Sequence, residues 1–288
     1  MIKRANDCAV GIGNLLTPGA MDGHQASNIP VFHEHYRCRL GQTTILTGYP
    51  SSGKSFFAMN IQAALTSLHG WKHFLYTPEM GSAEEIYLTL AEILTGVNVG
   101  YGLNENVLYQ ILPFIHEHFF VFEPDSSPTM ESITKEVTKA AIEHDINTFS
   151  IDNLNDLSHN ITGTQDIYFE NQLLIFNQCA KNSKVHGFLL AHPAKPQPDD
   201  LNLPPTPDKI KGGSAFWSKG QTILSLRDAN EHLQVAVYKA KPRYVAKKGD
   251  FLLKKEYKRS TYSGASGGNT VFMFEQAAHQ QPNQEPAF

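Results

Sequence analysis

Short runs of apolar and β-branched residues alternate with longer helical patterns through the middle of the 288-residue chain. The runs that predict strands are Thr43–Thr47, His73–Tyr76, Phe119–Phe122, Ile146–Ile151 and Val185–Ala191. The segments between them are long enough for crossover helices, which is typical of a mostly parallel sheet. We therefore predict an α/β fold with a mostly parallel, twisted sheet and helices on both faces.

The pattern changes after Gly220, where three strand-like runs follow one another without room for a helix. These runs are Thr222–Leu226, Val235–Ala240 and Phe251–Tyr257. Short connections join antiparallel strands, so the runs predict an antiparallel C-terminal extension of the same sheet. Before them, residues 195–207 contain five prolines and predict a long exposed loop. From residue 263 the chain is rich in Gly and Ser and then in Gln and Pro, which predicts a mostly flexible tail.

The segment after the first predicted strand reads Gly48-Tyr-Pro-Ser-Ser-Gly53-Lys54-Ser55 and fits the pattern G-x-x-x-x-G-K-[ST]. In this pattern, glycines let backbone N–H groups turn toward phosphates, the lysine reaches the β- and γ-phosphates, and the serine ligates Mg²⁺. Residues 56–68 predict a helix whose positive end faces the anion. We therefore predict a site for ATP and Mg²⁺. Its expected contacts are Gly48, Ser51, Ser52, Gly53, Lys54, Ser55 and Phe56.

Asp152 directly follows the predicted strand Ile146–Ile151. A triphosphatase needs a second oxygen ligand for Mg²⁺, and the carboxyl end of a buried strand is where such a ligand belongs. The metal ligands expected from the sequence are thus Ser55 and Asp152. The alternative is an aspartate that merely starts a turn.

Two other strand ends carry candidate catalytic residues. Glu79 follows the second predicted strand and is the candidate general base for the attacking water. Its alternative is a surface residue ahead of the helix that opens at Ser82 with a capping-box sequence. His192 ends the fifth strand, where it can bond the γ-phosphate and report its loss, although a lone histidine there is also consistent with a structural role.

Composition narrows the remaining choices. At 41% hydrophobic residues, the chain can bury one large core, and no apolar stretch approaches the roughly 20 residues of a membrane helix. The first residues lack the apolar core of a signal peptide, so we expect a cytoplasmic protein without a membrane partner. The widely spaced Cys8, Cys38 and Cys179 predict reduced thiols rather than a zinc site.

The net charge of −4 requires any nucleic-acid site to be a local basic patch. Residues 239–259 contain nine Lys and Arg residues against two acidic ones. A solvated hairpin face explains this cluster equally well.

Together, these motifs resemble the RecA-fold core of ring-shaped replicative helicases, of the Twinkle and phage primase-helicase type in the DnaB-like superfamily. Thr77–Met80 resembles the motif that carries the catalytic glutamate, Ile151–Leu157 the Walker B segment, and Ala191–Lys195 the phosphate-sensor motif. The residues before the P-loop, Ile29–Tyr36, also resemble this branch. The resemblance implies a RecA-like ATPase domain at residues 29–262, between an N-terminal arm (1–28) and the tail (263–288).

The resemblance also assigns DNA contacts. Ile210–Ala215 resembles the central loop that holds single-stranded DNA in the channel of the ring, which implies DNA-binding roles for Lys211 and Gly212. Lys195, at the start of the proline-rich segment, is implied in the same way. A flexible loop without a DNA contact is the alternative.

Further matches concern the edges of the nucleotide site. Lys241-Pro-Arg243 is similar to a K-x-R segment whose arginine reaches a neighbouring subunit's γ-phosphate, which implies that Arg243 is an arginine finger and leaves Lys239 as an alternative register. Arg227 and Tyr257 match the pair that sandwiches the base. The alternative for that pair is an exposed arginine and a sheet tyrosine.

The function implied is an ATP-dependent helicase or translocase that moves 5′ to 3′ on single-stranded DNA in replication. It would hydrolyse ATP at the interfaces of a homo-oligomer, in this family a hexameric ring, with any primase or loader as a separate protein. Two alternatives stay open: a recombinase-like or accessory DNA-binding ATPase without unwinding activity, and a nucleotide-gated loader or regulatory subunit. Two features depart from the family pattern. The first 30 residues contain no convincing linker helix, and Lys219-Gly220-Gln221 stands where an acidic residue is usual.

Overall fold

The computed structural model describes residues 3–161, 163–196, 202–242 and 245–264. Its main sheet has nine strands. They are β3 (Thr43–Gly48), β4 (His73–Tyr76), β5 (Phe119–Val121), β6 (Thr148–Ile151), β7 (His186–Ala191), β8 (Thr222–Ala229), β9 (His232–Lys239), β10 (Gly249–Glu256) and β11 (Thr261–Gly264). The order across the sheet is β11-β10-β9-β8-β3-β7-β6-β4-β5.

The six strands from β8 to β5 in this order run parallel, whereas β9, β10 and β11 are added antiparallel. The predicted mostly parallel sheet with an antiparallel extension is therefore confirmed. A small second sheet pairs β1 (His24–Gln25) with β2 (Arg37–Cys38).

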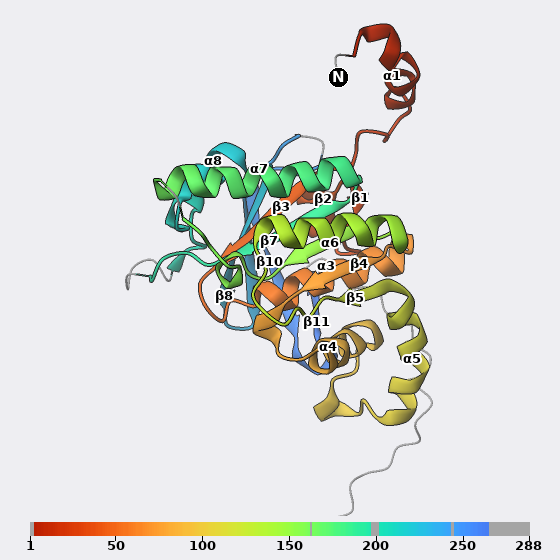
Figure 1. Ribbon diagram of the computed structural model, residues 1–288. Helices are drawn as coiled ribbons and strands as arrows, with labels where there is room; N and C mark the ends of the chain where they lie inside the picture. The colour runs from red at the N-terminus through yellow and green to blue at the C-terminus, as the bar shows by residue number, and fades with distance from the viewer. Residues whose placement is uncertain (1–2, 162, 197–201, 243–244, 265–288) are drawn as a thin grey trace, which may run out of the picture.

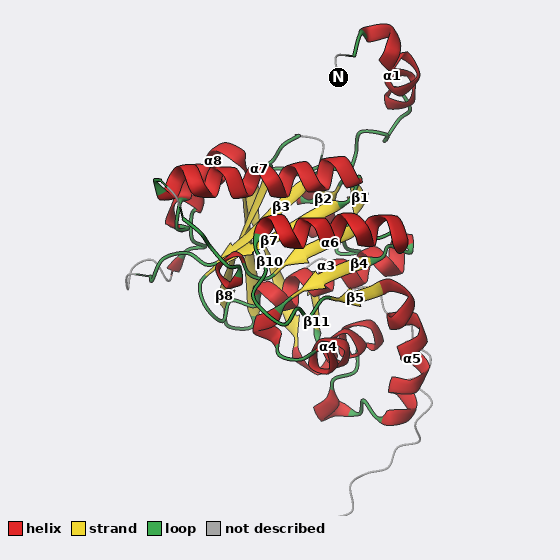
Figure 2. Ribbon diagram, in the orientation of Figure 1, coloured by secondary structure: helices red, strands yellow, loops and turns green. Residues whose placement is uncertain are grey.

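Helices cover both faces of the main sheet (Figures 1 and 2). The helices of the described residues are α1 (Ala9–Leu15), α2 (Pro30–His35), α3 (Lys54–His69), α4 (Ala83–Thr95), α5 (Glu105–His118), α6 (Met130–Glu143), α7 (Gln165–Ser183) and α8 (Gly213–Lys219), of which α1 does not contribute to this cover. Single 3₁₀ turns lie at Ala5–Cys8, Pro78–Met80, Val99–Tyr101, Leu154–Asp156, Pro207–Lys209 and Tyr257–Arg259.

Alternation along the central strands divides the core between the two faces. In β3, Ile45 packs into the core shared with α6, α7 and α8, whereas its neighbour Leu46 packs into the core shared with α3. β7 repeats the pattern with Leu189 and Leu190. A third cluster joins α3 to α4, α5 and β4. Successive side chains of a strand point to opposite faces, so strands buried on both sides are apolar almost throughout.

Within the main sheet, β11 is the strand that the sequence pattern did not reveal. Its four residues include one large apolar side chain, Tyr262, which is buried against Phe56 and Phe57 of α3. A pattern this short carries too little alternation to predict a strand. The strand nevertheless places Tyr262 beside the first turn of α3.

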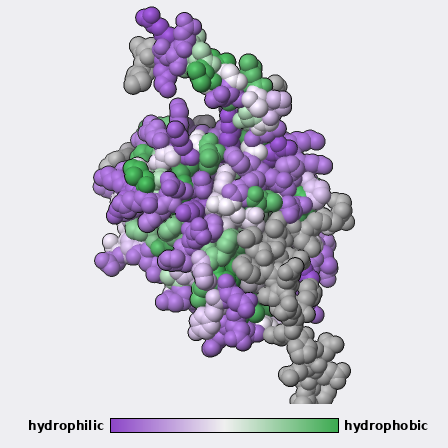
Figure 3. Space-filling view, turned by 90° about the vertical axis from the view of Figure 1, so that its right-hand side faces the viewer, coloured by the Kyte–Doolittle hydropathy of each residue, from purple (hydrophilic) through white to green (hydrophobic). Residues whose placement is uncertain are grey.

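The N-terminal arm contains α1, which stands away from the body of the protein (Figures 1 and 3). No residue of α1 is buried, and the exposed apolar side chains include Val10 (81%) and Leu16 (79%), the latter just past the end of the helix. The sequence patterns did not indicate this helix. An exposed apolar surface of this kind is expected where another protein surface packs.

The described ranges contain no helix that combines the length and the apolar character needed to cross a membrane. Cys8, Cys38 and Cys179 are all free thiols.

Two buried histidines link stability to pH. Burial lowers the pKa of His73 to about 3 and that of His186 to about 4. The Nδ1–H of His186 donates to the backbone oxygen of Arg39 at 2.8 Å, and its Nε2 lies 3.0 Å from Thr44 Oγ1. Both rings are therefore neutral in the folded protein, whereas unfolded histidines protonate near pH 6.5.

The stability that these histidines contribute is present above pH 6.5 and is lost as pH falls toward 4 and 3. We expect each to destabilise the fold by about 2 kcal/mol at pH 5 relative to pH 7. The pKa of Asp152 is raised to about 6 in the folded protein, so between pH 7 and pH 5 the folded state binds this proton more readily than the unfolded state does. This offsets about 1 kcal/mol of the loss. Urea unfolding at both pH values checks the expectation, and His186→Gln should show a smaller pH dependence than wild type. An equal dependence in the two proteins would contradict it.

Candidate nucleotide-binding site

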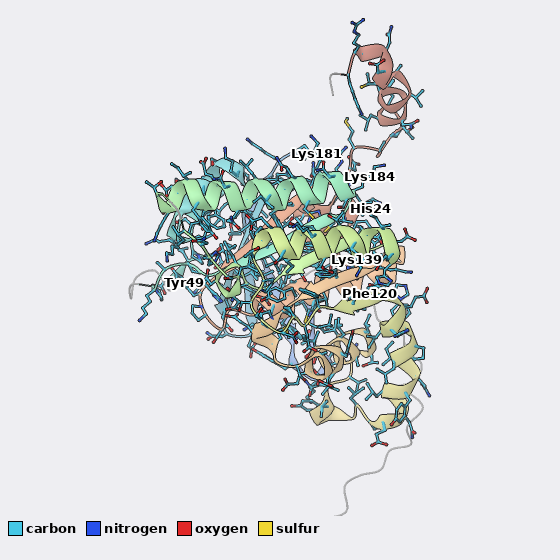
Figure 4. The ribbon with its side chains drawn as sticks, in the orientation of Figure 1. His24, Tyr49, Phe120, Lys139, Lys181 and Lys184 are labelled. Atoms are coloured by element: carbon cyan, nitrogen blue, oxygen red, sulfur yellow. The ribbon has the colours of Figure 1, made fainter. Side chains whose placement is uncertain are left out.

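The parallel strands β3, β7, β6 and β4 are neighbours, so their carboxyl ends meet at one edge of the sheet. The P-loop, Glu79, Asp152 and His192 each follow one of these strands directly or within a few residues. Figure 4 shows Tyr49 of the P-loop at this edge, with Lys184, which precedes β7, on the far side of the molecule. The structure thus brings together four elements that lie far apart in the sequence.

Close approach explains Gly48 of the P-loop, and a positive φ explains Gly53. A Cβ atom at Gly48 would lie 2.4 Å from Ser52 Oγ and 2.7 Å from the backbone oxygen of Leu226. Gly53 has a φ of +79° and leads directly into α3. A side chain at either position would therefore move the backbone that the phosphates need.

Lys54 is the first residue of α3, and its ammonium is held within the loop. Its Nζ donates to the backbone oxygens of Gly48 at 3.0 Å and Tyr49 at 3.3 Å. Burial lowers the Lys54 pKa, while the charges of Asp152 and Glu79 raise it. A cation and the amino end of a 16-residue helix therefore coincide at the P-loop, which is an arrangement suited to an anion.

Asp152 is 1% exposed, and neither of its carboxylate oxygens has a hydrogen-bond partner among the described residues. Its pKa is raised to about 6, chiefly by burial; the charge of Glu79 also raises it, whereas the Ser55 hydroxyl and Lys54 lower it. A buried carboxylate without partners is costly unless a cation or water satisfies it.

The donor set at this point fits Mg²⁺. Asp152 and Ser55 supply a carboxylate and a hydroxyl oxygen near one another, and Mg²⁺ is commonly held by one or two such ligands together with phosphate oxygens and water. The described residues include no group of three or more His, Cys, Asp and Glu side chains placed to hold a metal without such help.

Glu79 and His192 contact each other. His192 Nε2 lies 3.1 Å from Glu79 Oε1 and 3.2 Å from Oε2, while the buried Nδ1 has no partner among the described residues. Sequence reasoning placed each residue at the site but missed their contact. It also missed Asp156, whose pKa is raised first by burial and then by the charge of Glu79. Asp156 lies in the Walker B-like segment, and this position could have indicated that it belongs to the site.

A pocket of about 450 Å³ adjoins the P-loop. Ser51, Ser52, Gly53, Phe56 and Tyr257 are among its lining residues. Arg227 is placed elsewhere: its Nη1 donates to Gln234 Oε1 at 3.0 Å. The structure therefore brings Tyr257, but not Arg227, to this pocket.

The segments before and after the proline-rich loop lie side by side. Pro193 and Ile210 form an antiparallel bridge, and the N–H of Ala194 donates to the backbone oxygen of Lys209 at 2.8 Å. Lys195 and Lys211, next to these residues, are exposed. Two of the expected DNA contacts therefore lie on one stem, directly after His192.

Gly212 has a packing role in this stem. Its φ is +78°, and a Cβ atom there would lie 2.5 Å from Cδ2 of Phe169 on α7. The glycine therefore permits the close approach of α8 to α7.

Arg243 lies outside the described residues. Lys239, the alternative register, is buried, and its Nζ donates to the backbone oxygens of Trp217 and Ser218 at the end of α8. These bonds hold the Lys239 side chain against α8 of the same chain. Lysines have favourable interactions with helix carboxyl ends, which accounts for its position.

The described basic residues of 239–259 do not lie on one face. The N–H of Lys247 donates to the backbone oxygen of His35, and Lys247 and Lys248 lie between β9 and β10 at the amino edge of the parallel strands. β10 runs toward the opposite edge, where Lys255 lines the pocket beside the P-loop. A single basic patch made by this segment is thus inconsistent with the fold.

The departure at Gly220 and Gln221 has a structural explanation. Gln221 Oε1 accepts a hydrogen bond from the N–H of Thr43 at 2.8 Å, so an acceptor oxygen at this position secures the start of β3. A Cβ atom at Gly220 would lie 2.6 Å from the backbone oxygen of Phe216. A glutamine supplies the acceptor as an acidic residue would.

No protein-family profile matches the chain. Among curated proteins, it is similar to the Twinkle homolog protein, chloroplastic/mitochondrial, of Arabidopsis thaliana, with 24% identity over 241 residues. The match covers 77% of this chain and 34% of that protein, so the chain spans about a third of the length of this relative.

Solved structures show the same fold over nearly the whole chain. A solved ATPase domain superposes with a TM-score of 0.75 at 14% identity, covering 92% of this chain and 99% of that one. A DnaB-like replicative helicase, described with its interactions with primase, superposes with a TM-score of 0.70 at 12% identity, covering 91% of this chain and 67% of that one. The chain therefore has the RecA-like fold of the ATPase domains of DnaB-like helicases, and its sequence similarity to the Twinkle type is confirmed.

Proposed function

We propose that the protein is an ATPase that couples ATP hydrolysis to movement along single-stranded DNA, as a replicative helicase of the Twinkle and DnaB-like type. The observation that carries the proposal is the buried Asp152 carboxylate, which has no hydrogen-bond partner among the described residues. It lies close enough to Lys54 and Glu79 for their charges to shift its pKa. A P-loop, a cation-seeking carboxylate and a Glu–His pair at one sheet edge are the parts that phosphoryl transfer to water needs.

In the proposed reaction, Lys54 and the N–H groups of the P-loop hold the β- and γ-phosphates, with Ser55 and Asp152 as the residues for Mg²⁺. Mg²⁺ bound with ATP supplies neutralisation of phosphate charge. Glu79 accepts a proton from water as the water oxygen bonds to the γ-phosphorus. The bond from that phosphorus to the β–γ bridging oxygen breaks, and ADP and phosphate leave.

The contact between Glu79 and His192 supports a link between this chemistry and DNA. His192 bonds Glu79, the proposed general base. The next residues along the chain form the stem that carries Lys195 and Lys211. A change at the γ-phosphate therefore has a short covalent route to the DNA-contact residues. The Glu79–His192 pair also weighs against a nucleotide-gated subunit that hardly hydrolyses ATP.

Replacing Lys195 and Lys211 together by alanine should weaken binding to single-stranded DNA. Two lost phosphate contacts lower the slope of log affinity against log salt by about 1.4, because each contact contributes about 0.7 for single strands. Fluorescence anisotropy of a labelled oligonucleotide over a salt series measures this slope. The pair Lys247→Ala and Lys248→Ala, at the opposite sheet edge, is the charge-matched control. Equal losses in both double variants would contradict the assignment.

The proposed assembly is a homo-oligomer, a hexameric ring by resemblance, with ATP bound between subunits and Arg243 as the finger contributed in trans. The exposed apolar side chains of α1 support self-association, and a second copy of this chain is the occupant we propose for them. A primase or loader would be a separate partner. The interactions with primase described for the solved DnaB-like helicase are a property of that helicase.

A forked DNA duplex with a labelled strand tests unwinding directly. We expect ATP-dependent release of the strand by wild type and none by Lys54→Ala. DNA binding and ATP turnover without strand release would instead favour the accessory ATPase.

A further inference from the structure

Alternation along β8 places Arg227 on the sheet face opposite the pocket. Leu224 and Leu226 pack into the core shared with α3, so Arg227 points to the other face and Asp228 back toward α3. The hydrogen bonds of Arg227 are consistent with this orientation. Arg227 Nη1 donates to Gln234, and Gln234 Nε2 donates to Asp250 Oδ2 at 3.1 Å. These three polar side chains form a row across β8, β9 and β10 on the face away from the P-loop.

Lys255 stands on the pocket face. Phe251 and Leu253 of β10 pack into the core shared with α3, and Lys255 follows them in the same alternation. Its Nζ bonds Asp228 Oδ2 at 2.6 Å, and its side chain is 14% exposed. The pair therefore joins β8 to β10 at the pocket wall.

Tyr257 completes this wall. Its ring lies 5.9 Å from the Lys255 ammonium, and its hydroxyl donates to the backbone oxygen of Asn230 at 3.0 Å. The residue is 63% exposed although its hydroxyl is fixed, so an open aromatic face is held in one orientation. Such a face suits stacking of a nucleobase, while the ammonium and the carboxylate suit its polar edge.

The family resemblance already implies that the base stacks on Tyr257. We infer that the Lys255–Asp228 pair recognises the polar edge of that base, and that Arg227 does not contact the base. The base stacks on Tyr257, Lys255 donates to an acceptor on the ring, and Asp228 accepts from an amino group. The pocket of about 450 Å³ beside the P-loop, lined by all three residues, is continuous with the loop through Ser51 and Gly53. This inference rests on the proposed nucleotide site and adds its base-side contacts.

Calorimetric binding of two probes, Mg²⁺–ATP and inorganic tripolyphosphate with Mg²⁺, separates base contacts from phosphate contacts. We expect Lys255→Met to weaken ATP binding about 10-fold or more, in keeping with loss of one charge-assisted bond. Tripolyphosphate binding should stay within about 2-fold, because Lys255 contacts no phosphate. Tyr257→Ala, an exposed position, should show the same selectivity.

Arg227→Met and Lys254→Met are the matched controls, because both lie on the β-sheet face opposite Lys255. Each should leave ATP affinity within about 2-fold of wild type. Weaker ATP binding in Arg227→Met with normal binding in Lys255→Met would overturn the inference, as would an equal loss for both probes in Lys255→Met. If wild type bound neither probe, the proposed function itself would fail, which is a different result.

Discussion

Lys54→Ala should lower ATP turnover by about 10²- to 10³-fold, the range seen when one group that stabilises developing charge is removed. Lys54 is buried, its ammonium faces two P-loop carbonyls, and the charges of Asp152 and Glu79 act on it. Nothing else among the described residues of the P-loop carries a positive charge. Steady-state phosphate release measures the effect.

The fold should tolerate this change. The alanine variant loses two bonds to backbone oxygens, each worth about 1 kcal/mol, but also relieves the burial of a charge. We therefore expect its thermal unfolding within a few degrees of wild type. Turnover retained within about 3-fold in a folded Lys54→Ala protein would exclude hydrolysis at the P-loop.

Glu79→Gln should reduce the turnover number by about 10²- to 10⁴-fold, the usual contribution of a general base. Glutamine keeps the size of the side chain but cannot accept the proton from water. ATP affinity should change little, because Glu79 acts on the water rather than on the phosphates. Single-turnover hydrolysis together with calorimetric ATP binding separates the two effects.

Glu84→Gln is the control for this variant. Glu84 lies in the first turn of α4, five residues from Glu79, and should leave turnover unchanged. A small effect of Glu79→Gln on a slow wild-type turnover would support the nucleotide-gated alternative. A loss of ATP binding in Glu79→Gln would show instead that the residue shapes the pocket.

The sheet was predictable because its parallel strands are buried on both faces and are therefore short runs of apolar and β-branched residues. β3 and β7 have this character, and each is followed by a residue or loop whose chemistry marks a strand end. Since parallel strands share one carboxyl edge, the sequence also predicted that the P-loop, Asp152 and His192 would meet.

Features set by three-dimensional contacts were not predictable. The Glu79–His192 bond joins residues 113 positions apart, and no local pattern encodes it. The placement of Arg227 depends on the phase of alternation in β8, which requires knowing which core Leu226 enters. α1 was missed because its apolar side chains face solvent rather than the core.

The contact made by Gln221 was not predictable from the sequence either. From the sequence, the glutamine looked like the loss of an acidic residue. In the structure, the Gln221 side chain instead accepts a hydrogen bond from the N–H of Thr43 through its uncharged amide oxygen.

The most direct test of the proposed function is steady-state ATP hydrolysis with and without single-stranded DNA, with Lys54→Ala as the baseline for contaminating activity. We expect single strands to stimulate turnover in wild type and to have no effect above baseline in the variant. Turnover indifferent to DNA, or wild-type activity no higher than that of Lys54→Ala, would contradict a DNA-coupled motor.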